Sequence, residues 1–179
     1  LFIIFGGTGD LMQRKLLPAF LNVIAKSDIN PEFISVLGVA RETEFDDQGY
    51  RQWISKKVQG DKVCEKLLQE HDFVNRIYYQ PLPESSEKEF EKLAGKIQEI
   101  EDTAGLPGNR AFYLAIPPQG VPATVTNLGK VGLNKSPGWT RLVIEKPFGH
   151  DLESAKALNQ TVHEHFSEDQ IYRIDHYLG

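Results

Sequence analysis

Short runs of apolar residues alternate along the chain with longer stretches in which apolar residues recur every three or four positions. The short runs have the length of buried strands, and the longer stretches have the period of helices that bury one face. The pattern predicts strands over residues 1–5, 33–39, 73–79, 110–116, 141–145 and 171–177. It predicts helices over residues 11–26, 45–58, 62–71, 84–101 and 151–166. Such alternation indicates an α/β fold with a doubly wound, mainly parallel sheet that carries helices on both faces.

Three features add detail to this pattern. Pro18 lies inside the first helix and, because proline has no amide hydrogen, we expect it to kink this helix or to divide its first turns from the rest. Asp151 is a favourable N-cap for the last helix. The helix over 84–101 is rich in charge, and we expect most of its surface to be solvated.

Composition narrows the class of protein. The 179 residues, 40% apolar and 25% charged, suit one soluble globular domain. A net charge of -5 argues against a general nucleic-acid binder, and no apolar run approaches the roughly 20 residues that span a bilayer. Cys64 is the single cysteine, which excludes an intrachain disulfide and favours a reducing, cytoplasmic location. The spacing of histidine and cysteine predicts no metal site.

A glycine-rich turn, Gly6-Gly7-Thr8-Gly9, joins the first predicted strand to the first predicted helix. Glycines in this context let backbone amides approach a pyrophosphate, and the helix N-terminus adds a partial positive charge. The third position of the dinucleotide fingerprint is Met12, whose bulk is expected to push helix and strand apart or to tilt the helix. Asp10 is expected to cap the helix. The turn predicts a Rossmann-type dinucleotide-binding domain over residues 1–179, with a plain glycine-rich turn as the alternative.

The end of the second predicted strand bears on which dinucleotide is bound. An acidic residue there suits the ribose hydroxyls of NAD, whereas arginine accommodates the 2′-phosphate of NADP. Arg41 follows this strand and favours NADP, while Glu42 comes next and keeps NAD use open. A solvated Arg41–Glu42 pair is the simpler alternative.

Glu145 and Lys146 lie at the carboxyl end of the fifth predicted strand, the edge where ligands bind in doubly wound sheets. Pro147 fixes its own φ and restricts Lys146, so the ammonium is expected to be aimed rather than mobile. A cis Lys146–Pro147 bond would sharpen that aim. The alternative is an ordinary strand end that carries a surface lysine.

The last predicted strand ends in a cluster of ionisable side chains. On an extended strand Asp175 and Tyr177 point one way and His176 the other. His176 and Tyr177 can donate hydrogen bonds to an anionic group, and Asp175 can orient an imidazole that acts as a base. A pairing of Asp175 with Arg173 is the alternative.

Three segments taken together resemble glucose-6-phosphate dehydrogenase, namely residues 6–11 (GGTGDL), 145–149 (EKPFG) and 173–179 (RIDHYLG). Their order and separation match the N-terminal coenzyme domain of that family over essentially the whole chain. The resemblance implies transfer of hydride from C1 of glucose 6-phosphate to NADP, giving the lactone of the pentose phosphate pathway.

The resemblance also implies roles for individual residues. Arg41 would meet the 2′-phosphate, and Lys146 would contact both nicotinamide and sugar. His176 and Tyr177 would hold the substrate phosphate, and Asp175 would be the catalytic partner of a base histidine from the following domain. The coenzyme site would comprise Gly6, Gly7, Thr8, Gly9, Asp10, Leu11, Met12, Gln13, Arg41 and Lys146.

The family's large α+β domain, with the base and the interface of the homo-oligomer, does not occur in these 179 residues. The family motif continues with a lysine where this chain stops, so we expect the chain to be inactive alone. Two alternatives stay open: a non-catalytic dinucleotide-binding module, and another NAD(P)-dependent sugar oxidoreductase, since enzymes resembling glucose-fructose oxidoreductase also place Glu-Lys-Pro after a Rossmann strand.

Overall fold

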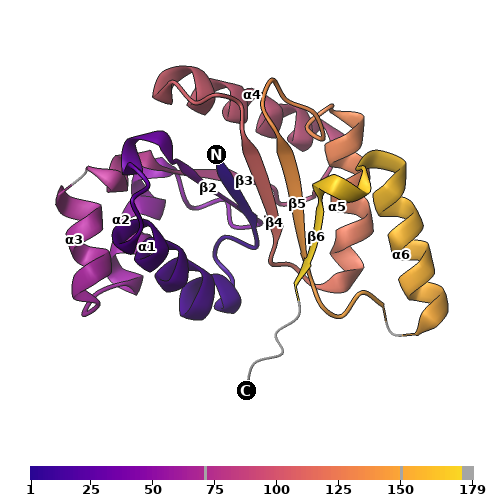
Figure 1. The fold of residues 1–179 in the computed structure, drawn as a ribbon, viewed down its shortest axis with the longest axis horizontal. Helices are drawn as coiled ribbons and strands as arrows, with labels where there is room; N and C mark the ends of the chain where they lie inside the picture. The colour runs from indigo at the N-terminus through magenta and orange to yellow at the C-terminus, as the bar shows by residue number, and fades with distance from the viewer. Residues whose placement is uncertain (71, 150, 175–179) are drawn as a thin grey trace.

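A computed structural model describes residues 1–70, 72–149 and 151–174. It contains one six-stranded sheet in the order β3-β2-β1-β4-β5-β6, and every strand pair in the described residues is parallel (Figure 1). This order is that of a Rossmann-type sheet and confirms the predicted doubly wound fold. The strands are β1 (Phe2–Phe5), β2 (Val36–Ala40), β3 (Ile77–Pro81), β4 (Arg110–Leu114), β5 (Thr140–Glu145) and β6 (Ile171–Ile174).

Helices cover both faces of the sheet. The first three lie on one face and the last three on the other (Figure 1). They are α1 (Leu17–Lys26), α2 (Asp47–Lys57), α3 (Lys62–Glu70), α4 (Glu87–Ala104), α5 (Val121–Lys130) and α6 (Leu152–His165). A π-helical segment, η1, and four short 3₁₀ helices complete the described elements, namely η1 (Met12–Leu16), η2 (Pro31–Phe33), η3 (Phe73–Arg76), η4 (Pro118–Gly120) and η5 (Glu168–Gln170).

Alternation of side chains along the strands builds two separate cores. Ile3 and Phe5 point into the core under α4, α5 and α6, whereas Ile4 between them points into the core under α1, α2 and α3. All three are buried. Because successive side chains of a strand face opposite sides, a strand covered on both faces is apolar throughout, as this one is.

Two strands begin later than the pattern predicts. Phe33 and Phe73 belong to the 3₁₀ helices η2 and η3, and β2 and β3 start only at Val36 and Ile77. Phe73 is fully buried although it precedes its strand, and Phe33 is 66% exposed. An apolar run therefore overestimates a strand when its first residue packs from a turn or lies at the surface.

Pro18 divides the first helix, as predicted. The π-helical segment ends with the amide of Leu17, which donates to the carbonyl of Met12. Pro18, the next residue, has no amide hydrogen with which to continue that pattern, and α1, which starts at Leu17, carries this proline in its first turn. A change in helix type thus replaces a sharp break.

Short polar side chains cap the N-termini of α4 and α6. Asp151 caps α6, accepting a 2.8 Å hydrogen bond from the amide of Ser154, as predicted. Ser86 and Glu89 form a capping box at the start of α4. Half of α4 is exposed and its other face is buried by apolar residues, so the predicted solvation holds for one side of the helix.

Helix α5 is absent from the predicted elements. Val121, Val125 and Leu128 recur at helical spacing and are buried. Pro117, Pro118 and Pro122 surround the start of the pattern, but prolines before a helix and in its first turn are compatible with helix formation. The apolar spacing was therefore the signal that could have revealed this helix.

In the described residues no helix is both long and apolar enough to cross a membrane. The same part of the chain holds no group of three or more histidine, cysteine, aspartate or glutamate side chains placed to bind a metal ion.

Candidate coenzyme-binding site

The glycine turn lies where β1 is flanked by β2 and β4, the point at which the strand order reverses. The amides of Gly6 and Gly7 both donate to the carbonyl of Val39, at 2.8 and 3.0 Å. A Cβ on Gly6, whose φ is +82°, would lie 2.2 Å from the carbonyl oxygen of Ala115. The turn is thus pressed against both neighbouring strands, and its position is that of ligand sites in doubly wound folds.

Contacts within the turn fix its remaining backbone. The amide of Gly9 donates to the carbonyl of Gly6 at 2.9 Å, and the Gln13 side chain donates to the carbonyl of Thr8 at 2.7 Å. The helical segment that follows begins at the same edge, and the first amides of a helix have no carbonyl partner within the helix. Amides at a helix N-terminus favour an anion, so this turn can hold a pyrophosphate.

One expectation for this turn is wrong, and another stays a prediction. Asp10 forms no cap; its carboxylate pairs with Arg14 at 2.6 Å, and both side chains are 75% exposed. The side chain of Met12 is fully buried in the core under α1, α2 and α3, and the segment that begins at this residue is π-helical. The expected effect of its bulk on the spacing or tilt of the helix stays a prediction.

The segment after β2 places Arg41 and Glu42 beside the turn. The hydroxyl of Thr8 donates to the carboxylate of Glu42 at 2.7 Å, while Arg41 is exposed. Glu42 therefore bonds the turn rather than being engaged only in a solvated pair with Arg41. The guanidinium of Arg41 and the hydrogen-bonded carboxylate of Glu42 thus lie where the 2′-hydroxyl or 2′-phosphate of a dinucleotide is expected.

Two tyrosines lie beneath this edge, and sequence reasoning missed both. The hydroxyl of Tyr50 donates to the carbonyl of Gly7 at 2.7 Å, and that of Tyr79 donates to the carbonyl of Glu42 at 2.8 Å. Burial raises the pKa of both phenols well above the ordinary range, with the neighbouring Tyr79 adding to the effect on Tyr50. Both phenols therefore stay neutral donors. Helical spacing marks Tyr50 only as a core residue.

Glu145 and Lys146 lie at the same edge, at the end of β5. The hydroxyl of Tyr113 on β4 donates a short hydrogen bond to the carboxylate of Glu145, and burial followed by Glu145 itself raises the pKa of that phenol. Lys146 is exposed, and its peptide bond to Pro147 is cis, which the sequence allowed but did not predict. The Lys146 amide donates to the carbonyl of Ile174 at 3.2 Å.

The predicted cluster Asp175, His176 and Tyr177 lies outside the described residues. In the β5–β6 register Glu145 is opposite Ile174, the last described residue of the chain. Arg173, the alternative partner of Asp175, bonds Glu168 at 2.7 Å and Asn159 at 2.7 Å on the α6 side.

Residues 3–179 match the family model described as "Glucose-6-phosphate dehydrogenase, NAD binding domain". The chain belongs to the glucose-6-phosphate dehydrogenase family. A glucose-6-phosphate 1-dehydrogenase of Bacillus subtilis is 41% identical over 177 residues, and the cytoplasmic form 6 of Arabidopsis thaliana is 39% identical over 183 residues. Each alignment covers 99% of this chain and 35% of the relative, so the chain spans about a third of the relatives' length.

A solved structure of glucose-6-phosphate dehydrogenase in complex with its substrate glucose 6-phosphate superposes with a TM-score of 0.83 at 32% identity. The superposition covers 98% of this chain and 36% of that one. Membership in the glucose-6-phosphate dehydrogenase family confirms a domain of the NAD(P)-binding type and decides against the alternative of another sugar oxidoreductase.

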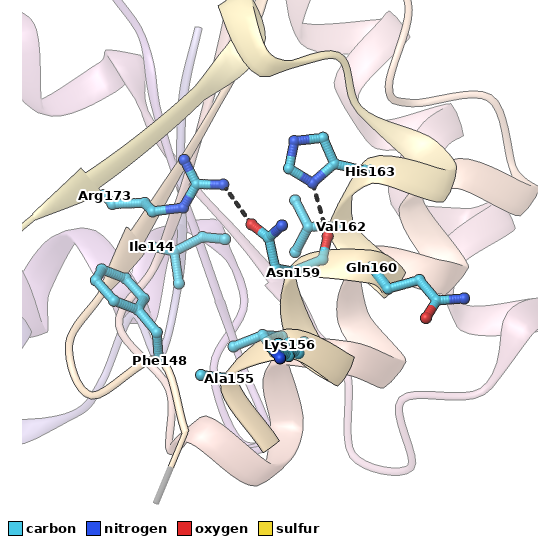
Figure 2. A pocket seen from close by; sticks show the side chains of 10 residues that line it. Ile144, Phe148, Ala155, Lys156, Asn159, Gln160, Val162, His163 and Arg173 are labelled. Carbon is cyan, nitrogen blue, oxygen red and sulfur yellow. Dashed lines mark hydrogen bonds between the residues drawn. The ribbon is translucent and has the colours of Figure 1, made fainter. Parts of the chain in front are cut away.

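A cavity of about 520 Å³ lies away from the glycine turn, between α6 and the strands β5 and β6 (Figure 2). Arg173 and His163 point into it, and both are already bonded. The ring nitrogens of His163 contact the carbonyl of Asn159 and the carboxylate of Glu168, each at 2.7 Å. These contacts tie β6 to α6 and give the cavity no evident part in the coenzyme site of a glucose-6-phosphate dehydrogenase.

Proposed function

We propose that this chain is the coenzyme-binding part of an NADP-dependent glucose-6-phosphate 1-dehydrogenase. That enzyme transfers hydride from C1 of glucose 6-phosphate to NADP and yields 6-phosphogluconolactone in the pentose phosphate pathway. The observation that carries the proposal is the family match over residues 3–179 in a fold that brings the glycine turn, Arg41 and Lys146 to the carboxyl edge of one sheet.

The residues at this edge fit a dinucleotide. A Cβ on Gly7 would lie 2.8 Å from the Cα of Gly38, so the turn runs as close to β2 as backbone allows. The amides of Gly6 and Gly7 both donate to the carbonyl of Val39, so the amides available to a pyrophosphate are those of Thr8 and of the start of the helical segment. Bound there, the coenzyme supplies the hydride acceptor.

The choice of NADP over NAD rests on Arg41. Its guanidinium is exposed directly after β2, and guanidinium groups bind phosphate through paired hydrogen bonds. Glu42 opposes this choice by its charge, but its carboxylate accepts the Thr8 hydroxyl. We expect binding of both coenzymes, with NADP bound more tightly.

Lys146 is proposed to contact both nicotinamide and sugar from the end of β5. His176 and Tyr177 are proposed to bind the substrate phosphate, and Asp175 to orient the base histidine. That histidine belongs to the part of the family that this chain does not match. We therefore propose that this chain alone binds coenzyme without turnover. We also propose that the parent enzyme is cytoplasmic and that it oligomerises through its α+β domain.

Chemical-shift mapping tests the proposal. NADP added to the ¹⁵N-labelled chain is expected to shift the amides of residues 6–13 and 41–42. Glucose 6-phosphate added to the NADP-saturated chain is expected to shift the amides around Lys146 and beyond Arg173. Shifts confined to the cavity under α6 would contradict the coenzyme assignment. A response to NADP without a response to glucose 6-phosphate would favour a non-catalytic dinucleotide-binding module.

A further inference from the structure

Two buried phenols support the coenzyme edge from below. Tyr50 on α2 and Tyr79 on β3 pack with their ring centroids 4.8 Å apart, and they are 0% and 3% exposed. Their hydroxyls bond different segments, the Tyr50 hydroxyl the carbonyl of Gly7 and the Tyr79 hydroxyl the carbonyl of Glu42. One aromatic pair thus holds both the glycine turn and the segment after β2.

The bond to Gly7 sets the direction of the next amide. A trans peptide is planar, so its carbonyl and the following N–H point in opposite directions. Tyr50 holds the Gly7 carbonyl toward the core, and the Thr8 amide therefore points away from the core, where a pyrophosphate is proposed to bind. The Gly7 amide is itself fixed by Val39, so the peptides on both sides of Gly7 are held.

The bond to Glu42 sets the position of the segment that discriminates between coenzymes. Tyr79 holds the backbone of Glu42 at 2.8 Å, next to Arg41. Further back, the Ala40 carbonyl accepts the amide of Leu82 at 2.6 Å. The backbone is thus held on both sides of Arg41, whose own side chain remains exposed.

The aromatic pair has little freedom to shift. A Cβ on Gly38 would lie 2.3 Å from the Tyr50 hydroxyl oxygen, so the phenol fills the space that glycine leaves in β2. The Tyr50 ring also stacks on Trp53, with centroids 5.5 Å apart. The amide of Tyr79 donates to the Asp47 carboxylate at 2.7 Å, which ties β3 to the start of α2.

We propose that Tyr50 and Tyr79 are positioning residues of the coenzyme site. Tyr50 serves recognition of the pyrophosphate that NAD and NADP share, and Tyr79 serves discrimination at the 2′ position. The proposal rests on the proposed coenzyme function and adds residues that touch no ligand themselves.

Calorimetric titration of the 179-residue chain with NADP, NAD and 2′-AMP separates these roles. Tyr50→Phe is expected to weaken the binding of NADP and of NAD by the same factor, roughly threefold to tenfold for a lost neutral hydrogen bond. The affinity for 2′-AMP is expected to stay unchanged, because 2′-AMP lacks the pyrophosphate. Tyr79→Phe is expected to weaken the binding of NADP by a larger factor than the binding of NAD. Tyr78→Phe is the matched control, because Tyr78 is the neighbouring phenol and packs against the opposite core.

The outcomes that overturn the proposal are distinct. Unchanged affinity of Tyr50→Phe for both coenzymes, or an equal loss of 2′-AMP binding, would refute the role of Tyr50. An unchanged ratio of NAD to NADP affinity in Tyr79→Phe would refute the role of Tyr79, and this ratio does not depend on the folded fraction. Failure of the unsubstituted chain to bind either coenzyme would instead refute the proposed function. Urea unfolding of each variant verifies that it is folded during the titrations.

Discussion

The Thr8 hydroxyl donates a 2.7 Å hydrogen bond to the Glu42 carboxylate, joining the glycine turn after β1 to the segment after β2. The two residues are 34 positions apart in the sequence. The contact places a negative charge beside the region proposed for the 2′-phosphate, where Arg41 supplies the opposing positive charge. We therefore expect Arg41 to favour NADP over NAD and Glu42 to disfavour NADP.

Replacement of Glu42 by glutamine is expected to strengthen NADP binding a few-fold. The amide oxygen can still accept the Thr8 hydroxyl, while the charge that repels a phosphate is removed. Calorimetric titration with NADP measures the change, and Glu44→Gln, which removes the same charge from an exposed site two residues later, is the control. Weaker NADP binding by Glu42→Gln would show that this carboxylate does not oppose the phosphate.

Replacement of Arg41 by alanine is expected to weaken NADP binding roughly tenfold or more and to leave NAD binding nearly unchanged, because only NADP carries the 2′-phosphate. The salt dependence of NADP binding should also become as shallow as that of NAD. Lys92→Ala is the control, since it removes one positive charge from the exposed surface of α4, a helix on the face of the sheet opposite α1, α2 and α3. Equal losses for the two coenzymes would contradict the role of Arg41.

The pair Arg110–Glu101 is expected to dominate the electrostatic part of the fold's stability. The two side chains form two hydrogen bonds of 2.7 Å each and are 7% and 5% exposed. Glu101→Gln should lower the free energy of unfolding by about 3–5 kcal/mol, because it leaves a buried guanidinium without its counter-charge.

Urea unfolding measures this loss against an exposed pair. Lys130 and Glu87 lie 3.1 Å apart with side chains about half exposed, and Lys130→Ala should cost less than about 1 kcal/mol. Similar losses in Glu101→Gln and Lys130→Ala would mean that the buried pair adds little stability.

The Cys64 thiol is expected to be inert in the folded chain. Burial, followed by the hydrogen bond and charge of Asp61, raises the pKa of Cys64 to about 12. The unfolded chain loses this proton near pH 9 and the folded chain keeps it, so stability contributed by Cys64 is present below pH 9 and falls as pH rises toward 12. A thiol reagent at pH 8 should react only after unfolding, and Cys64→Ala should remove the decline in unfolding free energy just above pH 9. Rapid labelling of the folded chain would contradict the expected protection.

The periodicity of the sequence was sufficient for the fold because alternation and helical spacing are local properties. Pro18 acts through its own ring, and Asp151 acts through a side-chain hydrogen bond to a residue three positions later, so both effects are local and could be predicted too. Phe73 shows the limit of the method, because a buried aromatic residue looks the same in a turn as in a strand.

The sequence predicted the placement of the candidate residues that follow directly from the ends of strands. The glycine turn, Arg41 and Lys146 lie at the ends of β1, β2 and β5 as predicted, and their roles stay proposals. The contacts of Glu42, Tyr50 and Tyr79 were not, because each joins elements that only the folded sheet brings together. The roles of Asp175, His176 and Tyr177 stay predictions, since those residues lie outside the described part of the chain.

Calorimetric titration of the unsubstituted chain with NADP and with NAD tests the central claim most directly. The account predicts one saturable site per chain for each coenzyme, with NADP bound more tightly than NAD. The absence of saturable binding for both would contradict the claim that this chain is the coenzyme-binding part of a glucose-6-phosphate dehydrogenase.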